Sequence, residues 1–327
     1  MKLAAMLGFL LLFGCSLLAL QVQQKEENAD IVLVIEEMKQ QDSGREIQLL
    51  DGETVLSIPL EEYLVGVVLT EMPVSFHPEA MKAQAVAART FAARHIDDEK
   101  HENADICSDS TCCQAWRSEA ELRQVFGENF EEYIEKGKSS VSETEGEVLL
   151  YDNNLIDAVY FSCSGGTSED AVAVWGTDVP YLQSVKSPGE EKSSKFSSEV
   201  HISFEEFCQR LKRADASVRF SVIPQDWLGE VCYTDGGGVD RILLGGVWFS
   251  GTEVRKIFQL PSTRFTLDVG DGEIVFSVLG YGHRVGMSQY GADAMAENGA
   301  AYKDILLHYY TGVTIKKLSR TDVGTVN

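Results

Sequence analysis

The chain has 327 residues and 44% of them are hydrophobic, enough for one large domain or two smaller domains with cores of their own. Its 28 basic and 51 acidic residues give a formal net charge of −23 at pH 7. A charge of this sign repels phosphate backbones and argues against a nucleic-acid partner. The sequence also has no P-loop, no dinucleotide-binding motif and no internal repeat.

An uncharged apolar segment runs from Leu3 to Leu20, directly after Lys2. At about 1.5 Å per helical residue it is long enough to cross the core of a bilayer. No Ala-x-Ala pattern follows the segment, so we expect an uncleaved membrane anchor, with Lys2 inside and the bulk of the chain outside the cytoplasm. The alternatives are a cleaved signal peptide and a lipid-attachment box that ends at Cys15.

The first folded elements are predicted to be a hairpin and a helix. Two short apolar runs at residues 47–50 and 54–58 flank an Asp-Gly pair, which suits the turn of a β-hairpin. Acids just after Pro59 predict a helix that ends before Pro73, so Glu71 lies where an apolar helix ends. A carboxyl group there loses hydration, which raises its pKa and suits it to donate a proton near neutral pH. The alternative is a capping or surface role.

A second helix is predicted from Pro78 to about Ala93. Proline and Glu79 suit its first turn, and its many alanines allow close packing. Lys82 and Arg89 are seven residues apart and therefore share one face of it. These two cations either bind a ligand or form ordinary salt bridges, as between Glu79 and Lys82.

A polar segment follows that contains His101, Cys107, Cys112 and Cys113. Three thiolates and an imidazole are a ligand set that Zn²⁺ prefers. The spacing matches no common zinc finger, but we expect a metal site. The alternative is disulfide bonding, because six cysteines, an even number, remain outside the predicted anchor.

The middle of the chain is predicted to contain a helix at residues 119–138 and a hairpin at residues 148–161. A turn of small residues follows at 162–169, where Cys163 is a candidate nucleophile with His283 as its base. No nucleophile-elbow pattern is present, so we favour a tight turn with a buried thiol.

Trp175 and Tyr181 follow this turn, and each is either a sugar-stacking or a core residue. A polar, serine-rich stretch at residues 190–199 is predicted to be a loop or an insertion. The block from Gly280 to Ala292 is dense in glycine, which permits sharp turns, and it carries His283. Further predicted elements are helices after Ser203 and Ser250, strands on either side of Asp271-Gly272, and a last helix at residues 302–310.

Three of these segments resemble the stage II sporulation protein D family of peptidoglycan lytic enzymes, which also includes amidase enhancers. They are Glu71-Met-Pro73, Glu79-Ala-Met-Lys-Ala-Gln-Ala-Val-Ala-Ala-Arg-Thr-Phe91 and Gly280-Tyr-Gly-His-Arg-Val-Gly-Met-Ser-Gln-Tyr-Gly-Ala292. The resemblance implies a lytic transglycosylase that cleaves the bond between N-acetylmuramic acid and N-acetylglucosamine, with Glu71 as its single acid and base. It implies zinc at the cysteine-rich segment, as in some clostridial members. We expect substrate contacts from Lys82, Arg89, Tyr181 and His283.

The resemblance also implies a role in engulfment of the forespore, outside the cytoplasm. The implied partners are stage II sporulation protein P, an amidase that strips stem peptides from the glycan, and stage II sporulation protein M, a membrane protein. Two rival hypotheses are a non-catalytic, glycan-binding amidase enhancer and a cysteine hydrolase.

The predicted fold is α+β, with the helix pair that carries Glu71 packed against β-rich middle and C-terminal parts. Its predicted divisions are an anchor at 1–20, a tether and first strand at 21–45, a catalytic domain at 46–318 and a tail at 319–327.

Overall fold

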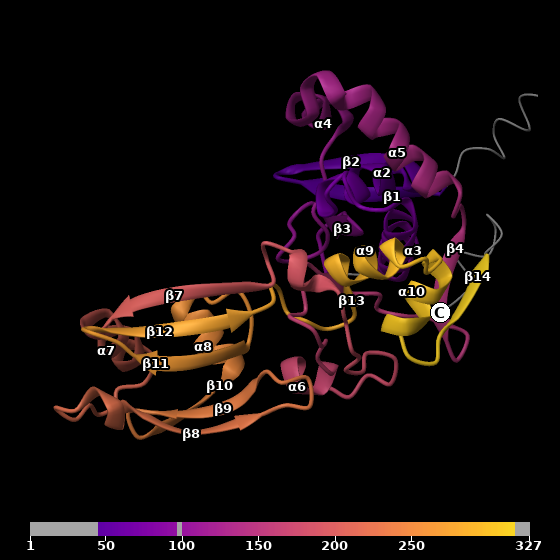
Figure 1. The fold of residues 1–327 in the computed structure, drawn as a ribbon. Coiled ribbons are helices and arrows are strands. Elements are labelled where there is room, and N and C mark those ends of the chain that lie inside the picture. The colour runs from indigo at the N-terminus through magenta and orange to yellow at the C-terminus, as the bar shows by residue number, and fades with distance from the viewer. Residues whose placement is uncertain (1–44, 97–99, 318–327) are drawn as a thin grey trace, which may run out of the picture. The chain divides into compact units, whose positions relative to one another are not determined.

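The computed structural model describes residues 45–96 and 100–317 (Figure 1). The predicted anchor, nearly all of the predicted tether and the predicted tail lie outside the described residues. Within the described ranges, no helix is both long and apolar enough to cross a membrane. Helices and several small sheets are mixed along the chain, which confirms the α+β class.

The helix pair forms at the predicted positions. α2 (Leu60–Glu71) has acids in its first turn and ends at Glu71, because Met72 is extended before a proline. α3 (Pro78–His95) begins with proline, and the ring of His77 accepts the backbone N–H of Glu79 at 3.2 Å. The predicted hairpin precedes α2 as β1 (Glu46–Asp51) and β2 (Thr54–Pro59), and β1 also pairs in parallel with β3 (Ile106–Cys107).

The predicted helix at residues 119–138 is two helices, which corrects the sequence-based assignment. α4 (Glu119–Phe126) ends at Gly127, whose φ of 55° lies outside the helical region. A short 3₁₀ turn, η1 (Gly127–Asn129), leads into α5 (Phe130–Ser142).

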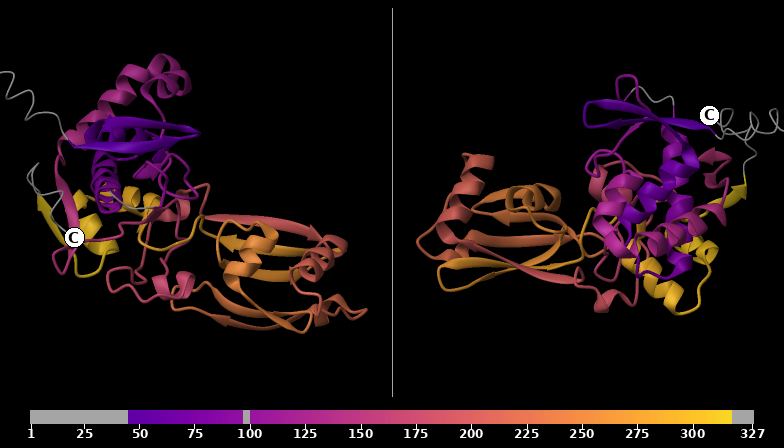
Figure 2. Two further views of the ribbon diagram at one scale, coloured as in Figure 1. Left: turned by 180° about the vertical axis from the view of Figure 1, so that it is seen from behind. Right: turned by 90° about the horizontal axis from the view of Figure 1, so that it is seen from above.

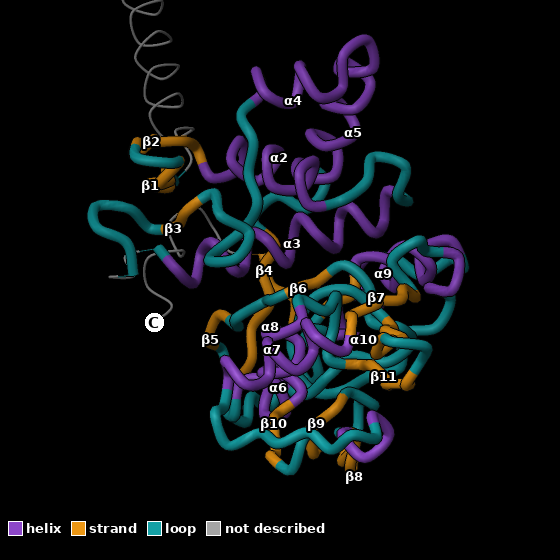
Figure 3. The backbone as a smooth tube through the Cα atoms, turned by 90° about the vertical axis from the view of Figure 1, so that its left-hand side faces the viewer, coloured by secondary structure: helices purple, strands orange, loops and turns teal. Residues whose placement is uncertain are grey.

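A first hydrophobic core surrounds α2 and α3. Figure 3 shows α2, α3 and α5 side by side, and α3 also packs on β4 (Glu147–Tyr151), α9 (Gln289–Glu297) and α10 (Tyr302–Tyr309). The buried alanines of α3 allow these close contacts, because a methyl side chain keeps neighbouring backbones near. The remaining elements outside residues 197–279 are β5 (Asn154–Leu155), β6 (Tyr160–Phe161), α6 (Ala171–Trp175), η2 (Glu190–Lys192), β13 (Met287–Ser288) and β14 (Thr314–Lys317).

A second hydrophobic core lies within residues 197–279. Two antiparallel sheets, with strand orders β11-β12-β7 and β10-β9-β8, surround it together with α7 and α8 (Figure 2). The rings of Phe207, Phe258 and Phe276 pack against one another at its centre. The bounds are β7 (Ser197–Ser203), α7 (Phe204–Ala214), η3 (Pro224–Trp227), β8 (Leu228–Tyr233), β9 (Val239–Leu244), β10 (Val247–Ser250), α8 (Gly251–Phe258), β11 (Arg264–Val269) and β12 (Glu273–Leu279).

Two sequence-based expectations are therefore corrected. The predicted packing of the helix pair was only partly right, since α2 and α3 contact mainly helices and β4, while β7 to β12 build a core of their own. Residues 190–199, predicted to be a loop or an insertion, are not a loop throughout, because β7 begins at Ser197, at the start of the segment with the second core, and the side chain of Glu190 is buried.

Residues 197–279, which contain the second core, leave the rest of the chain and return to it at the same place. Ser197 at the start of β7 pairs with Leu279 at the end of β12, and the N–H of Gly280 donates to the carbonyl of Phe196 at 2.8 Å.

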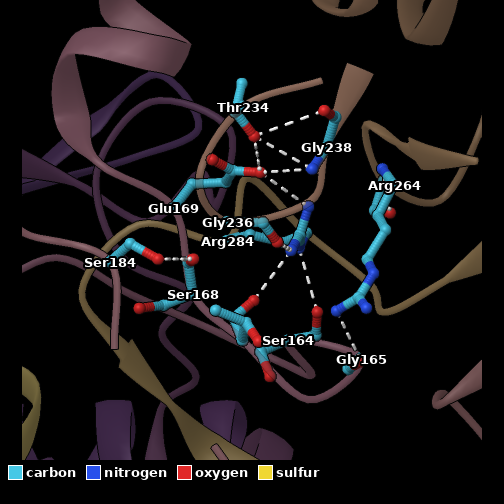
Figure 4. A network of polar contacts seen from close by, with 12 residues as sticks. Ser164, Gly165, Ser168, Glu169, Ser184, Thr234, Gly236, Gly238, Arg264 and Arg284 are labelled. Atoms are coloured by element: carbon cyan, nitrogen blue, oxygen red, sulfur yellow. Dashed lines mark hydrogen bonds and ion pairs between the residues drawn. The ribbon is translucent and has the colours of Figure 1, made fainter. Parts of the chain in front are cut away.

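A buried ion pair between Arg284 and Glu169 joins the Gly280–Ala292 block to the small-residue turn at 162–169 (Figure 4). Arg284 Nη1 lies 3.0 Å from Glu169 Oε1, and both side chains are almost fully buried. The β8–β9 turn completes the network, since Glu169 Oε1 accepts the N–H of Gly238 at 2.9 Å and Arg284 donates to the carbonyl of Gly236 at 2.8 Å.

Candidate functional site

Glu71 is the last residue of α2, and its carboxyl group lies largely out of solvent. Its Oε1 accepts the backbone N–H of Ala115 at 2.8 Å, and its Oε2 lies 3.4 Å from the side-chain amide of Gln289, a long contact. Burial raises the pKa of Glu71, and these two hydrogen bonds offset the effect only in part. The group therefore keeps its proton to a higher pH than an exposed glutamate, as a general acid must.

Gly66 explains how a backbone N–H reaches this carboxylate. A Cβ at Gly66 would lie 2.3 Å from the indole nitrogen of Trp116 and 2.6 Å from the carbonyl oxygen of Arg117. The absence of a side chain thus lets the segment after Cys113 lie directly on α2, one turn before Glu71.

Two tyrosines and an amide lie beside Glu71. The buried amide of Gln114 is 3.3 Å from the hydroxyl of Tyr63, and the hydroxyl of Tyr160 donates to its oxygen at 2.7 Å. Burial raises the pKa of both tyrosines, and the negative charge of Glu71 raises it further. Both hydroxyls therefore remain protonated and can donate hydrogen bonds.

Sequence reasoning did not identify these neighbours. One signal was available for Tyr63, which precedes Glu71 by eight residues and so lies on a similar face of the helix. Gln114 and Tyr160 come from distant segments, and Ala115 contributes only its backbone. Gln289 lies inside the glycine-dense block, but nothing local pairs it with Glu71.

The loop after Glu71 is fixed from two sides. The ammonium group of Lys136 donates to the carbonyl oxygens of Val74 and Phe76, the latter at 2.6 Å. The N–H of His77 donates to the carboxylate of Asp293 at 2.7 Å. These contacts hold the chain where it passes from α2 to α3.

Lys82 and Arg89 have carboxylate partners in the structure. Lys82 lies 2.8 Å from Glu79 and 2.6 Å from Glu143. Arg89 is only 2% exposed and binds Glu61 through two hydrogen bonds of 2.7 Å. The geometry of Arg89 thus favours the salt-bridging alternative over contact with substrate.

Tyr181 and His283 also have internal partners. The hydroxyl of Tyr181 accepts the N–H of Asp157 at 3.1 Å, and its ring packs on Tyr151. His283 Nε2 lies 3.1 Å from the carbonyl oxygen of Tyr160. Burial lowers the pKa of His283 to about 4, so its ring is neutral at physiological pH.

Cys163 is not arranged as a nucleophile. Its buried thiol lies 3.4 Å from Glu190 Oε2, and burial raises its pKa to about 12. Both ring nitrogens of His283 have other partners, since Nδ1 accepts the N–H of Val285 at 3.1 Å. The thiolate that a cysteine hydrolase needs is therefore strongly disfavoured.

The four predicted metal ligands come together. Their ligand atoms all lie within 4.8 Å of one another. His101 Nε2 is 3.2 Å from Cys113 Sγ, and the sulfur atoms of Cys112 and Cys113 are 3.9 Å apart. Zn–S bonds of about 2.3 Å in a tetrahedron place two sulfurs roughly 3.7 Å apart, so these residues fit a four-coordinate zinc site. The described cysteines form no disulfide.

Comparisons with known proteins identify the family of this chain. A family model described as Stage II sporulation protein matches residues 51–151, which include Glu71 and the cysteine cluster. Proteins named stage II sporulation protein D from Bacillus amyloliquefaciens and Bacillus subtilis (strain 168) are each 38% identical over 270 residues, which cover 81% of this chain and 76% and 77% of theirs. A protein named amidase enhancer from Bacillus subtilis (strain 168) is 28% identical over 304 residues, covering 77% of this chain and 40% of that protein. The chain therefore belongs to the stage II sporulation protein D family.

Proposed function

We propose that this protein is a lytic transglycosylase that cleaves the bond between N-acetylmuramic acid and N-acetylglucosamine in peptidoglycan, in spore formation. The observation that carries the proposal is the partly buried carboxyl group of Glu71, whose pKa is raised by loss of solvent. Family membership supports the cell-wall substrate.

The sequence motifs around Glu71 support a transglycosylase over a hydrolase. A glycoside hydrolase normally uses two carboxylates, one as acid and one as base or nucleophile. No second acid stands out in the motifs that carry the family resemblance. A transglycosylase needs one carboxyl group, because the 6-hydroxyl of the sugar is a nucleophile already held close to the anomeric carbon.

The proposed reaction balances without water. Glu71 gives its proton to the glycosidic oxygen, which leaves with the electron pair of the broken bond to the anomeric carbon. The 6-hydroxyl oxygen then bonds to that carbon, and the Glu71 carboxylate takes the hydroxyl proton and is ready for another cycle. The muramic acid product ends in a 1,6-anhydro ring.

Mass analysis of products from purified glycan tests this reaction. We expect 1,6-anhydro ends from the wild type and no turnover from Glu71→Gln, because an amide cannot supply the proton. Glu62→Gln, an exposed change on the same helix, is the matched control and should remain active. Products with ordinary reducing ends would refute the transglycosylase, and full activity of Glu71→Gln would remove Glu71 from the mechanism.

A second function is favoured by the relative named amidase enhancer. In that case the protein would bind glycan and stimulate an amidase without cleaving the strand. The turnover assay separates the two functions, since an enhancer would bind purified glycan and release nothing from it.

We also propose that His101, Cys107, Cys112 and Cys113 hold a structural Zn²⁺. Four protein ligands fill a tetrahedral ion, so the metal would stabilise the loop and not activate water. Gln114 and Ala115 directly follow the last ligand, so the ion would steady the segment that contacts Glu71.

The cellular setting is likewise a proposal. The uncharged segment from Leu3 to Leu20 supports attachment to the cell membrane, with the rest of the chain outside the cytoplasm. There the protein would act on glycan strands with stage II sporulation proteins P and M. Protease treatment of intact cells should then digest the part that carries Glu71, and protection would contradict this placement.

A further inference from the structure

Glu190 is a buried carboxylate at the start of the short turn η2, with 1% of its surface exposed. Its Oε2 accepts the N–H and the hydroxyl of Ser164 at 3.0 and 2.7 Å and the N–H of Gly166 at 3.2 Å. Its Oε1 accepts the hydroxyl of Ser187 at 2.7 Å and the hydroxyl of Ser288. These partners are all neutral donors and fill the acceptor sites of a carboxylate.

Apart from Ser187, the donors on Glu190 come from the two segments that lead to the Glu71 site. Ser164 lies in the turn just after β6, the strand that carries Tyr160. Ser288 caps α9 by accepting the N–H of Gly291 at 3.2 Å, and the next residue, Gln289, contacts Glu71. β6 and β13 are paired in parallel, with Tyr160 opposite Met287. One carboxylate therefore ties together the backbones that deliver Tyr160 and Gln289.

The packing around Glu190 leaves no room for a side chain at Gly291. A Cβ on Gly291 would lie 2.8 Å from Glu190 Oε1, 2.1 Å from the hydroxyl oxygen of Ser187 and 2.0 Å from that of Tyr309. The glycine at this point of the Gly280–Ala292 block thus makes space for the carboxylate and its donors.

We propose that Glu190 is a positioning residue for the Glu71 site, which fixes the turn after β6 and the start of α9 so that Tyr160 and Gln289 are held against Glu71. The kinetic test of this role rests on the proposed function, because it measures turnover of glycan. Glu190 does not touch the reacting atoms, and it acts through the two segments that it holds.

Glu190→Gln tests this role with little change in size. The amide replaces one acceptor oxygen by an NH₂ group, which must face donors already aimed at that position. A misplacement of about 1 Å at a reacting centre costs about 100-fold, so kcat and kcat/KM should fall together by about that factor. Glu191→Gln, an exposed change at the next residue, is the matched control and should leave both values unchanged.

A second pair of variants decides the matter where Glu190→Gln does not fold. Ser187→Ala and Ser288→Ala each remove one buried hydroxyl from the same oxygen, but only Ser288 directly precedes Gln289. The positioning role predicts that Ser288→Ala loses more kcat than Ser187→Ala when both are assayed well below their transitions, since Ser288→Ala also removes the cap of α9 and should have the lower melting temperature. Equal kcat for the two variants would overturn it.

A spectroscopic readout keeps the inference independent of the reaction. The side-chain amide resonances of Gln289 should move in Glu190→Gln and stay in place in Glu191→Gln. If wild-type protein forms no anhydro product, the proposed function fails while this measurement still decides the positioning role. Unmoved Gln289 resonances in a folded Glu190→Gln protein would overturn the inference, whatever the products are.

Discussion

Replacing Arg89 by alanine should destabilise the protein far more than it impairs turnover. The guanidinium group is 2% exposed and forms two hydrogen bonds of 2.7 Å with Glu61. It also donates to the carbonyl oxygens of Val141 at 3.1 Å and Glu147 at 3.3 Å. Alanine would leave a cavity and several acceptors without a donor.

The magnitude follows from what is left behind. Removing one partner of a buried ion pair costs about 3–5 kcal/mol. The side chain of Glu61 is 37% exposed and can rehydrate, so we expect the lower end, about 3 kcal/mol. For a protein of this size that corresponds to a fall in melting temperature of roughly 6–10 °C.

Thermal unfolding and a turnover assay well below the transition measure the two effects separately. Lys82→Ala is the matched control on the same helix, because the side chain of Lys82 is more exposed than that of Arg89 and such pairs contribute about 1 kcal/mol or less. If Arg89→Ala kept the wild-type melting temperature but lost turnover, the structural reasoning would be wrong and Arg89 would be a substrate ligand.

Three further predictions concern the acid, the metal and the close approach at α2. The folded protein raises the pKa of Glu71, so the folded state keeps this proton to higher pH than the unfolded state and ionisation favours unfolding as pH rises. Glu71→Gln should therefore be more stable than wild type in urea near neutral pH, with the gain vanishing below the unfolded pKa of about 4.3; a gain independent of pH would contradict this. Metal analysis should find about one zinc per chain, lost in Cys107→Ser and retained in Cys208→Ser, whose cysteine lies outside the cluster; wild-type protein without zinc would exclude the site. Gly66→Ala should lose about 1–3 kcal/mol by urea unfolding, because its Cβ would lie 2.6 Å from a backbone oxygen, whereas Gly270→Ala meets only ordinary contacts and should lose less.

The sequence predicted those elements whose signals are local. Helix ends and turns are fixed by the conformations of neighbouring residues. Examples are the proline before α2 and the acids in its first turn, the proline after Glu71, and the Asp-Gly pairs. The location of Glu71 at a helix end and the gathering of the four metal ligands in one short segment follow from signals of this kind.

Burial at polar positions could not be predicted in the same way. Arg89 is buried because Glu61 and the end of α5 meet α3, and these contacts join residues 28 and 52 positions apart. Glu190 lies in a polar stretch typical of a surface loop, and its burial depends on Ser164 and Ser288, which are 26 and 98 positions away. Periodicity and capping rules describe one segment at a time and carry no information on such partners.

The two ends of the segment with the second core are adjacent, so the segment is an insertion that the chain could close without. Its residues nevertheless hydrogen-bond a buried ion pair in the rest of the protein. Its first and last strands pair at the point of exit, so a short linker in place of residues 197–279 would close the chain without stretching it. Such a deletion would also remove the Gly236 carbonyl and the Gly238 N–H, and it would leave the charges of Glu169 and Arg284 short of partners. A shortened protein would keep the Glu169–Arg284 pair but with fewer hydrogen bonds to it, so the loss of residues 197–279 should also destabilise the part of the chain that remains.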